Sequence, residues 1–427
     1  MPPIFWTQKQ DIGPSARTSA GVAYDAARQR LLVFGGDPGG PPLADTWQWD
    51  GNLWTQVADT GPSGRQGHAM ADYAAGQKVV LFGGAAGAGL HGDTWTWDGS
   101  EWMQVADTGP AARAGHALAY DSVRQRVVLF GGASTGMLGD TWTFDGTEWT
   151  QVQDTGPSAR RGHAMAFDSV LGKVLLFGGA GVNGTGQGDT WAWDGATWSQ
   201  VADTGPEGRI GAGLVGTSTM LLFGGVNSVD PTLAPTSRVL YGDSWRWNGA
   251  TWTKVQDSGP APRYGHGMAF RSHAGRIVLF GGASAFEAAE NAALAPGLRN
   301  DTWEVPDTAA QSGDEPLAGD GTGDVLSVEV SPTSAGVGDQ VLVTVTFNGP
   351  PQAGTGLVVA IFAEVNNDWV QQEPPGFMIP TVTLDGAQTT VAFAIWRDGT
   401  PLSPGQYAVA VGTSPTAMQA TALMVTS

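Results

Sequence analysis

Four histidines recur at one position of a repeated sequence pattern, each directly after an Arg-x-Gly triplet: His68, His116, His163 and His266. Neutral imidazoles bind transition metals and protonated ones bind anions, so four of them near one axis could hold either kind of ligand. The alternative is a structural histidine, hydrogen-bonded between neighbouring repeats. Two further copies of the pattern carry Ala20 and Ala212 instead, so the imidazole is not obligatory for folding.

An arginine stands three residues before each of these positions, including the two that carry alanine. The six are Arg17, Arg65, Arg113, Arg160, Arg209 and Arg263. Together with the histidines they are the candidate ligand-binding residues. In the alternative reading, each arginine pairs with one of six repeated aspartates, Asp45, Asp93, Asp140, Asp189, Asp243 and Asp301. The equal numbers favour such pairs, which would leave little charge for a ligand.

Glu207 is the one acidic departure inside the repeated turn, where other copies have serine or alanine. With His163 of the preceding copy, it is a weak candidate for a catalytic acid/base pair. The alternative is a solvated surface glutamate.

The elements that must position these residues are six similar units. The stretch Asp154–His163 has near-copies that begin at Asp11, Asp59, Asp107, Asp203 and Asp257. Each unit continues as a small-residue strand, an apolar strand ending in a glycine pair, a variable loop and two tryptophan-bearing strands joined by an Asp-Gly or Asn-Gly turn. Four strands repeating every 46 to 57 residues indicate propeller blades.

The sequence therefore predicts an all-β fold, with a six-bladed β-propeller over residues 1–305. The sixth unit lacks its fourth strand, and Phe5–Asp11 resembles that missing strand. We therefore expect the N-terminal strand to complete the last blade and remove an exposed sheet edge.

Phe-Gly-Gly after the apolar strand, then Asp-Thr-Trp-x-Trp and a further tryptophan, resembles the kelch repeat over residues 4–305. Kelch propellers include enzymes, adaptors and carbohydrate- or protein-binding modules, so the resemblance implies the fold more than the function. In kelch adaptors, arginines at this strand entry contact acidic partners, which the resemblance extends to the six arginines here.

Two enzymes of this fold bear on the chemistry. Galactose oxidase joins a kelch propeller to an immunoglobulin-like domain, but its copper site needs a cysteine and a C-terminal histidine. This chain has no cysteine and no histidine beyond His273, which excludes that site. A sialic-acid-epimerase-like activity would use Glu207 and His163 at the channel mouth.

Residues 306–323 read as a polar linker. Residues 324–427 contain about seven alternating strands, typical of an immunoglobulin- or fibronectin-like β-sandwich. The net charge of −19 and the absence of a basic domain argue against a nucleic-acid partner. No apolar run is long enough for a transmembrane helix, so no membrane insertion is expected. No cofactor is predicted, and calcium is left open because no EF-hand spacing is present.

From these patterns we expect a non-enzymatic bacterial binding protein, extracellular or on the cell surface, with cytoplasmic location not excluded. It would recognise a glycan or protein through the propeller face that bears the Gly-Pro-x-x-Arg turns, named here the arginine face. Two long loops, residues 226–242 and 283–300, are expected on the same face. A carbohydrate-active enzyme and a structural subunit of an extracellular assembly are the alternatives.

Overall fold

The computed structural model describes residues 4–10, 12–87, 89–153, 155–217, 219–230, 237–255, 257–284 and 297–307, and nine strands between residues 325 and 425. The chain divides into two compact units. One is Trp6–Ser312, and the other combines Met1–Phe5 with Gly313–Ser427. Among the described residues, no helix is long and apolar enough to cross a membrane.

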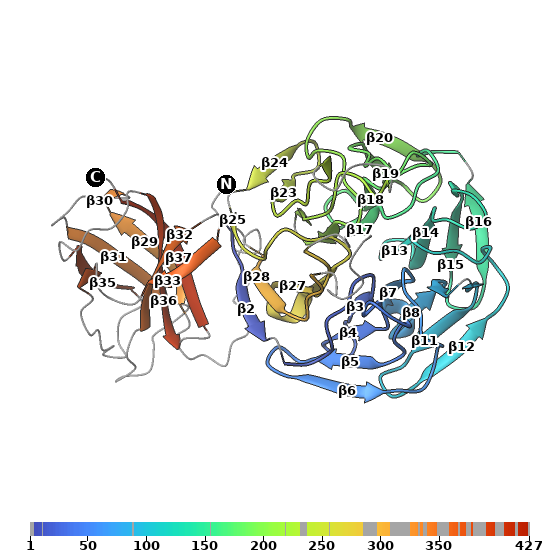
Figure 1. Ribbon diagram of the computed structural model, residues 1–427, viewed down its shortest axis with the longest axis horizontal. Helices are drawn as coiled ribbons and strands as arrows, with labels where there is room; N and C mark the ends of the chain where they lie inside the picture. The colour runs from blue at the N-terminus through green and yellow to red at the C-terminus, as the bar shows by residue number, and fades with distance from the viewer. Residues whose placement is uncertain are drawn as a thin grey trace. The chain divides into compact units, whose positions relative to one another are not determined.

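The first unit consists of six four-stranded antiparallel sheets arranged in a ring (Figure 1). Blade one is β3 (Gly21–Asp25), β4 (Arg30–Phe34), β5 (Thr46–Trp49) and β6 (Trp54–Ala58). Blade two is β7 (Ala69–Tyr73), β8 (Lys78–Phe82), β11 (Thr94–Trp97) and β12 (Trp102–Ala106). Blade three is β13 (Ala117–Asp121), β14 (Arg126–Phe130), β15 (Thr141–Phe144) and β16 (Trp149–Gln153).

The other three blades repeat this order. Blade four is β17 (Ala164–Asp168), β18 (Lys173–Phe177), β19 (Thr190–Trp193) and β20 (Trp198–Ala202). Blade five is β21 (Gly213–Gly216), β22 (Met220–Phe223), β23 (Ser244–Trp247) and β24 (Trp252–Val255). Blade six is β26 (Gly267–Arg271), β27 (Arg276–Phe280), β28 (Thr302–Pro306) and β2 (Thr7–Gln10). The predicted six-bladed propeller is confirmed.

Short elements lie between these strands: β1 (Ile4–Phe5), β9 (Ala85–Ala86), β10 (Gly89–Leu90), β25 (Asp257–Ser258) and the 3-10 turns η1 (Ala74–Gly76) and η3 (Ser272–Ala274).

The second strand of each blade is apolar because neighbouring blades cover both of its faces. In β4, Leu31, Leu32, Val33 and Phe34 are all fully buried. Outer-strand tryptophans add a repeated link between blades. The indole Nε1 of Trp198, for example, donates to Thr141 Oγ1 of the preceding blade at 2.9 Å. Equivalent bonds join Trp54 to Thr302, Trp102 to Thr46, Trp149 to Thr94 and Trp252 to Thr190.

The N-terminal strand closes the ring, as predicted. β2 pairs antiparallel with β28, with Thr7 opposite Glu304 and Gln8 opposite Trp303. Figure 1 shows the blue β2 alongside the gold β28. Trp6, just before β2, is buried and its ring centroid lies 5.5 Å from that of Phe223 in blade five.

The first strand of each blade is innermost, as predicted, and a closed ring of backbone hydrogen bonds precedes these strands. One residue per blade donates its N–H to the carbonyl of its counterpart in the preceding blade, at 2.7–2.9 Å. We call this ring the collar. Its members are Ser19, Gly67, Gly115, Gly162, Gly211 and Gly265. All six have φ between 55° and 69°, a conformation that favours glycine.

The second unit contains two sheets. Its strands are β29 (Val325–Ser331), β30 (Ser334–Ala335), β31 (Gln340–Phe347), β32 (Val358–Val365), β33 (Asp368–Gln372), β34 (Phe377–Met378), β35 (Thr390–Arg397), β36 (Gly405–Ser414) and β37 (Ala417–Val425). The sheet orders are β29-β31-β35-β34 and β30-β37-β36-β32-β33. Most of the predicted linker, residues 308–323, lies outside the described residues. The immunoglobulin-like sandwich stays a prediction.

Candidate binding face

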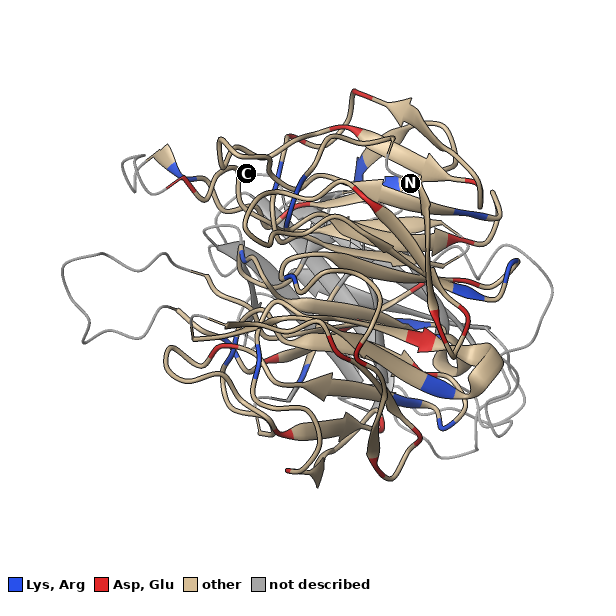
Figure 2. Cartoon of the chain, turned by 90° about the vertical axis from the view of Figure 1, so that its right-hand side faces the viewer, with Lys and Arg blue, Asp and Glu red and all other residues tan. Residues whose placement is uncertain are grey.

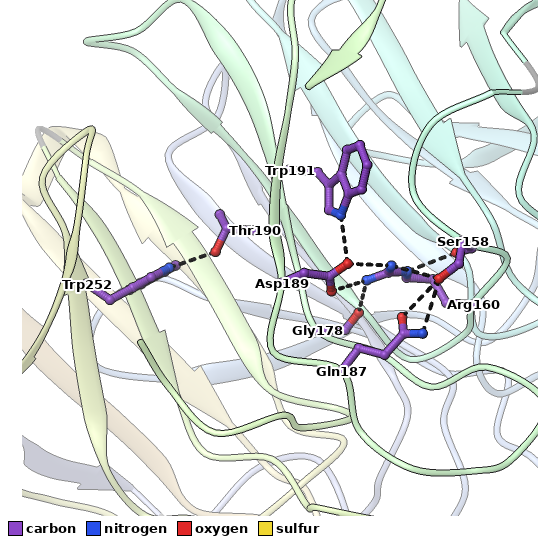
Figure 3. A network of polar contacts seen from close by, with 8 residues as sticks. All are labelled: Ser158, Arg160, Gly178, Gln187, Asp189, Thr190, Trp191 and Trp252. Atoms are coloured by element: carbon purple, nitrogen blue, oxygen red, sulfur yellow. Dashed lines mark hydrogen bonds and ion pairs between the residues drawn. The ribbon is translucent and has the colours of Figure 1, made fainter. Parts of the chain in front are cut away.

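Each repeat arginine forms a bidentate ion pair with the repeat aspartate of its own blade. The arginine lies in the turn that enters the first strand and the aspartate directly precedes the third strand, so antiparallel order brings both to one face. In blade four, Arg160 Nη1 lies 2.6 Å from Asp189 Oδ1 and Nη2 lies 2.8 Å from Oδ2 (Figure 3). The other pairs are Arg17–Asp45, Arg65–Asp93, Arg113–Asp140, Arg209–Asp243 and Arg263–Asp301.

Further hydrogen bonds fix each pair within its blade. Arg160 Nη1 also donates to the carbonyl of Gly178, the first glycine of the pair, and Nε donates to the carbonyl of Ser158. Asp189 Oδ2 accepts the indole N–H of Trp191 at 2.7 Å (Figure 3). The same bonds recur in every blade. Each pair therefore ties the first, second and third strands together.

Burial makes these pairs strongly coupled. The arginine side chains are at most 1% exposed and the aspartates 13–23% exposed. Burial opposes ionisation of the aspartates, but the hydrogen bonds and charge of the arginines outweigh it and hold the aspartate pKa values below their usual range. The question left open by the sequence is answered, since all six arginines are paired. This geometry favours their structural role over direct ligand binding.

The four histidines are buried between blades, 5–8% exposed. Each imidazole lies edge-on to the phenylalanine that ends the second strand of the preceding blade, with centroids 5.4–5.6 Å apart. His116 Nε2 lies 3.1 Å from the carbonyl oxygen of Phe82. The packing between blades is common to all four, and His68 and His116 also hydrogen-bond to the preceding blade, as in the structural alternative.

Burial, followed by the charge of the neighbouring arginine, lowers the pKa of all four histidines to about 3. They are therefore neutral at physiological pH. Within the part of the chain that the structure describes, no group of three or more histidine, aspartate or glutamate side chains is arranged to hold a metal ion.

Blade five departs from the repeat around its own ion pair. Glu207 is exposed, and its Oε2 accepts a hydrogen bond of 2.8 Å from the hydroxyl of Tyr241. The Tyr241 ring lies over the Arg209 guanidinium, with Cζ 4.1 Å from the ring centroid. Burial, followed by the bond to Glu207, raises the pKa of Tyr241 to about 12. Glu207 thus partners Tyr241, while His163 packs against Phe130, so the structure does not bring the predicted acid/base pair into hydrogen-bond contact.

The Arg209–Asp243 pair itself is looser than the others. Its Nη2–Oδ2 distance is 3.5 Å, against 2.8–3.0 Å in the other five blades. Asp243 Oδ2 is also 3.4 Å from Lys254 Nζ, where other blades have glutamine. Three residues that differ from those of the other blades thus lie around the Arg209–Asp243 pair. Glu207 replaces Ser or Ala, Lys254 replaces Gln, and Tyr241 occupies a position that varies between blades.

The loop of blade five is anchored to that of blade four. Gly186 N–H donates to the Asn227 carbonyl and Val229 N–H to the Gly184 carbonyl. The joined loops expose Val182 (89%) and Val239 (48%). Residues 231–236 of this loop and 285–296 of the blade-six loop lie outside the described residues.

Sequence reasoning found Glu207 but missed Tyr241 and Lys254. Tyr241 lies two residues before its repeat aspartate, and the residue at that position differs in nearly every blade. Such variation indicates a surface position that packing does not constrain. On the side of the chain that Figure 2 shows, basic and acidic residues are interspersed over the described strands and turns.

Comparisons with known proteins address the fold. The sequence model of the KLHDC2/KLHL20/DRC7 Kelch-repeats domain matches residues 6–179 and again 97–234. The solved "Structure of YjhT" aligns at a TM-score of 0.52 with 15% identity, over 68% of this chain and 95% of that one. AofleA from Arthrobotrys oligospora aligns at 0.38 with 10% identity, over 91% and 92%. None of the curated protein sequences matches the chain. At 15% identity, the likeness to YjhT supports the fold alone.

Proposed function

This chain belongs to the kelch-repeat family, and we propose on that premise that it is a non-enzymatic binding protein that recognises a glycan or another protein through its arginine face. Kelch propellers have a binding or interaction role in general. The identity of the ligand, the extracellular or cell-surface location, and a C-terminal sandwich as an accessory domain are parts of this proposal.

The observation that carries the proposal is the specialisation of blade five. A fold maintained only for packing would keep the same rim residues in each blade, as it keeps the arginine, the aspartate and the glycine pair. Glu207 breaks that pattern, and it bonds to Tyr241, whose position varies from blade to blade; both residues are accessible to solvent. A carboxylate acceptor, a fixed tyrosine and the nearby ammonium of Lys254 give the rim both donors and acceptors for a polar ligand.

The apolar side chains on the joined loops add to this rim. Val182 and Val239 are exposed beside the polar cluster, and loops held on a rigid scaffold commonly carry binding residues. A partly apolar, partly polar surface of this kind suits both a glycan and a protein ligand.

A binding screen with a matched pair of variants tests the proposal. The full-length protein is screened on a glycan array and, separately, for protein ligands by cross-linking in culture supernatant. The variant Glu207→Ser with Tyr241→Leu restores the residues used by other blades and should weaken any detected binding at least about tenfold. Its unfolding midpoint should stay near that of the wild type.

The control is Ser15→Ala, at the position of Glu207 in blade one, which should leave binding unchanged. If the double variant and the control bind every detected ligand as the wild type does, blade five is not the site. Arg113→Ala is not a suitable binding probe, because the buried pair it breaks supports the fold.

A further inference from the structure

Blade six, which the N-terminal strand completes, carries three charged residues at positions that are mostly neutral or oppositely charged elsewhere. Lys9 replaces a valine that the other five fourth strands share: Val57, Val105, Val152, Val201 and Val255. Glu304 takes the place of Gln48, Thr96, Thr143, Ala192 and Arg246. Arg271 takes the place of Asp25, Tyr73, Asp121, Asp168 and Thr217. Each change alone looks like ordinary variation.

In the folded chain the three side chains meet. Arg271 Nη1 lies 2.5 Å from Glu304 Oε1, and Lys9 Nζ lies 3.7 Å from Glu304 Oε2. Their side chains are 6%, 18% and 2% exposed for Arg271, Lys9 and Glu304. We call these three residues the closure cluster. Two cations around one buried carboxylate form a charge-assisted network in a low-dielectric setting.

The closure cluster also reaches blade one. Trp49 Nε1 donates to Glu304 Oε1 at 3.4 Å, and Arg271 Nη2 donates to the Asp50 carbonyl at 2.9 Å. The cluster therefore joins the N-terminal strand β2, the body of blade six and the neighbouring blade across the point where the ring closes.

A neutral link used elsewhere is not made at this blade. Five outer-strand tryptophans donate to a threonine of the preceding blade. In blade six, Trp6 would face Ser244 of blade five, and both Trp6 Nε1 and Ser244 Oγ are buried without a hydrogen-bond partner in the described structure. β2, which no hairpin joins to β28, thus lacks the tryptophan–threonine hydrogen bond of the other fourth strands. It has the charged contact of Lys9 with Glu304 instead.

The position of Lys9 depends on register. The pairing of β2 with β28 shifts between Gln8 and Gln10, so Lys9 occupies a bulge. A bulge redirects one side chain, and a slip of one residue reverses the faces of a strand. A slipped strand would move the ammonium away from Glu304 and place a glutamine there.

We propose that the closure cluster is a register lock, which holds the N-terminal strand in one alignment as it completes the propeller. A mispaired strand, or one from a second copy held out of register, leaves buried charges without compensation, and such states are strongly disfavoured. The lock acts on strand alignment, because the other five blades use a valine at the position of Lys9.

Hydrogen exchange on the full-length native protein tests the lock. Lys9→Glu sets a second carboxylate beside Glu304, and amides of β2 and β28 should exchange at least about tenfold faster, with blades two and three unchanged. The matched control is Gln8→Glu, which also introduces a carboxylate, at an exposed position of the same strand, and should stay within about twofold of the wild type. Equal exchange in the two variants would refute the lock.

A second variant distinguishes control of the β2 register from a general stabilisation of the propeller. Lys9→Val, Arg271→Tyr and Glu304→Thr together install the residues that blade two has at these positions, so the protein should fold. After refolding from denaturant at high concentration, its yield of native monomer should fall at least about twofold below that of the wild type, with slipped monomers and out-of-register dimers making up the difference. A yield of native monomer equal to that of the wild type would overturn the proposal.

Discussion

At the scale of single residues, the repeated arginines illustrate how a conspicuous charge can be wholly structural. Every guanidinium is nearly buried and bonded to an aspartate, a glycine carbonyl and a turn carbonyl. The arginines were candidates for ligand contact because they recur on one face. They recur because every blade uses the same arginine–aspartate ion pair to join its strands.

Breaking one such pair should therefore cost stability. Arg113→Met leaves the half-buried Asp140 carboxylate without its partner, so the free energy of unfolding should fall by about 3–5 kcal/mol. Urea denaturation measures the loss. The control Arg161→Met, an exposed arginine of blade four, should change stability by no more than about 0.5 kcal/mol. A similar small change for Arg113→Met would contradict the structural role.

Asp72 is a second residue whose environment departs from the repeat. Blades one, three and four end the first strand with an aromatic residue followed by aspartate, whereas blade two has Asp72 before Tyr73. The swap places Asp72 near the fully buried Asp25. Burial, followed by the charge of Asp25, raises the pKa of Asp72 to about 7.

The raised pKa predicts a pH-dependent effect of Asp72→Asn. The folded state holds the proton more tightly than the unfolded state, so the contribution of Asp72 is full below its unfolded value of 3.8. It is lost as pH rises through about 7. The variant should match the wild type near pH 4 and exceed it by roughly 2–4 kcal/mol at pH 8. Urea denaturation at both pH values checks this, with exposed Asp59→Asn as the control. An effect independent of pH would contradict it.

At the scale of elements, the collar requires a positive φ at one residue of each blade, a requirement that side-chain packing alone would not impose. Five of its six residues are glycine, and Ser19 adopts the same positive φ. The bonds run from each blade to the one before it, so a distortion in one collar residue affects two blade contacts.

Gly162→Ala should therefore be costly. The added methyl would lie 2.6 Å from Ile210 Cγ2 at a φ of +66°, and the free energy of unfolding should fall by about 2–3 kcal/mol. Gly136→Ala is the control, because a methyl there meets open space. Thermal unfolding of the two variants gives the comparison, and equal midpoints would show that the collar tolerates a side chain.

The sequence predicted the features that follow from the similarity of repeat copies, and it did not predict the contacts that side chains make outside their own repeat. Six copies of a turn predicted six blades, and the likeness of Phe5–Asp11 to a fourth strand predicted closure by β2, because both are relations between copies. The burial of His163 against Phe130 is a contact between two blades. The meeting of Lys9, Arg271 and Glu304 joins strands of blade six that come from opposite ends of the propeller sequence. No single repeat position encodes them, so they needed the fold.

At the scale of the whole molecule, the N-terminal strand holds the ring together from a free end. Deleting residues 1–10 removes β2, the buried Trp6 and Lys9 at once. The free energy of unfolding should fall by at least about 3 kcal/mol, and the bared edge of β28 should promote association. Thermal unfolding and light scattering measure both effects. Deleting residues 1–3 alone should change little, and equal behaviour of the two deletions would contradict the assigned role.

The position of that free end has a consequence for how the chain could be rearranged. β28 and β2 are antiparallel neighbours, just as the third and fourth strands are in blades where an Asp-Gly or Asn-Gly hairpin joins them. The propeller is thus a ring of hairpins in which only the hairpin between β28 and β2 is missing. A circular permutant of the propeller that joins these two strands and opens at the Asp98–Gly99 hairpin would have the same strand order around the axis. The closure cluster, more than the blade architecture, marks where the first and last strands of the propeller meet.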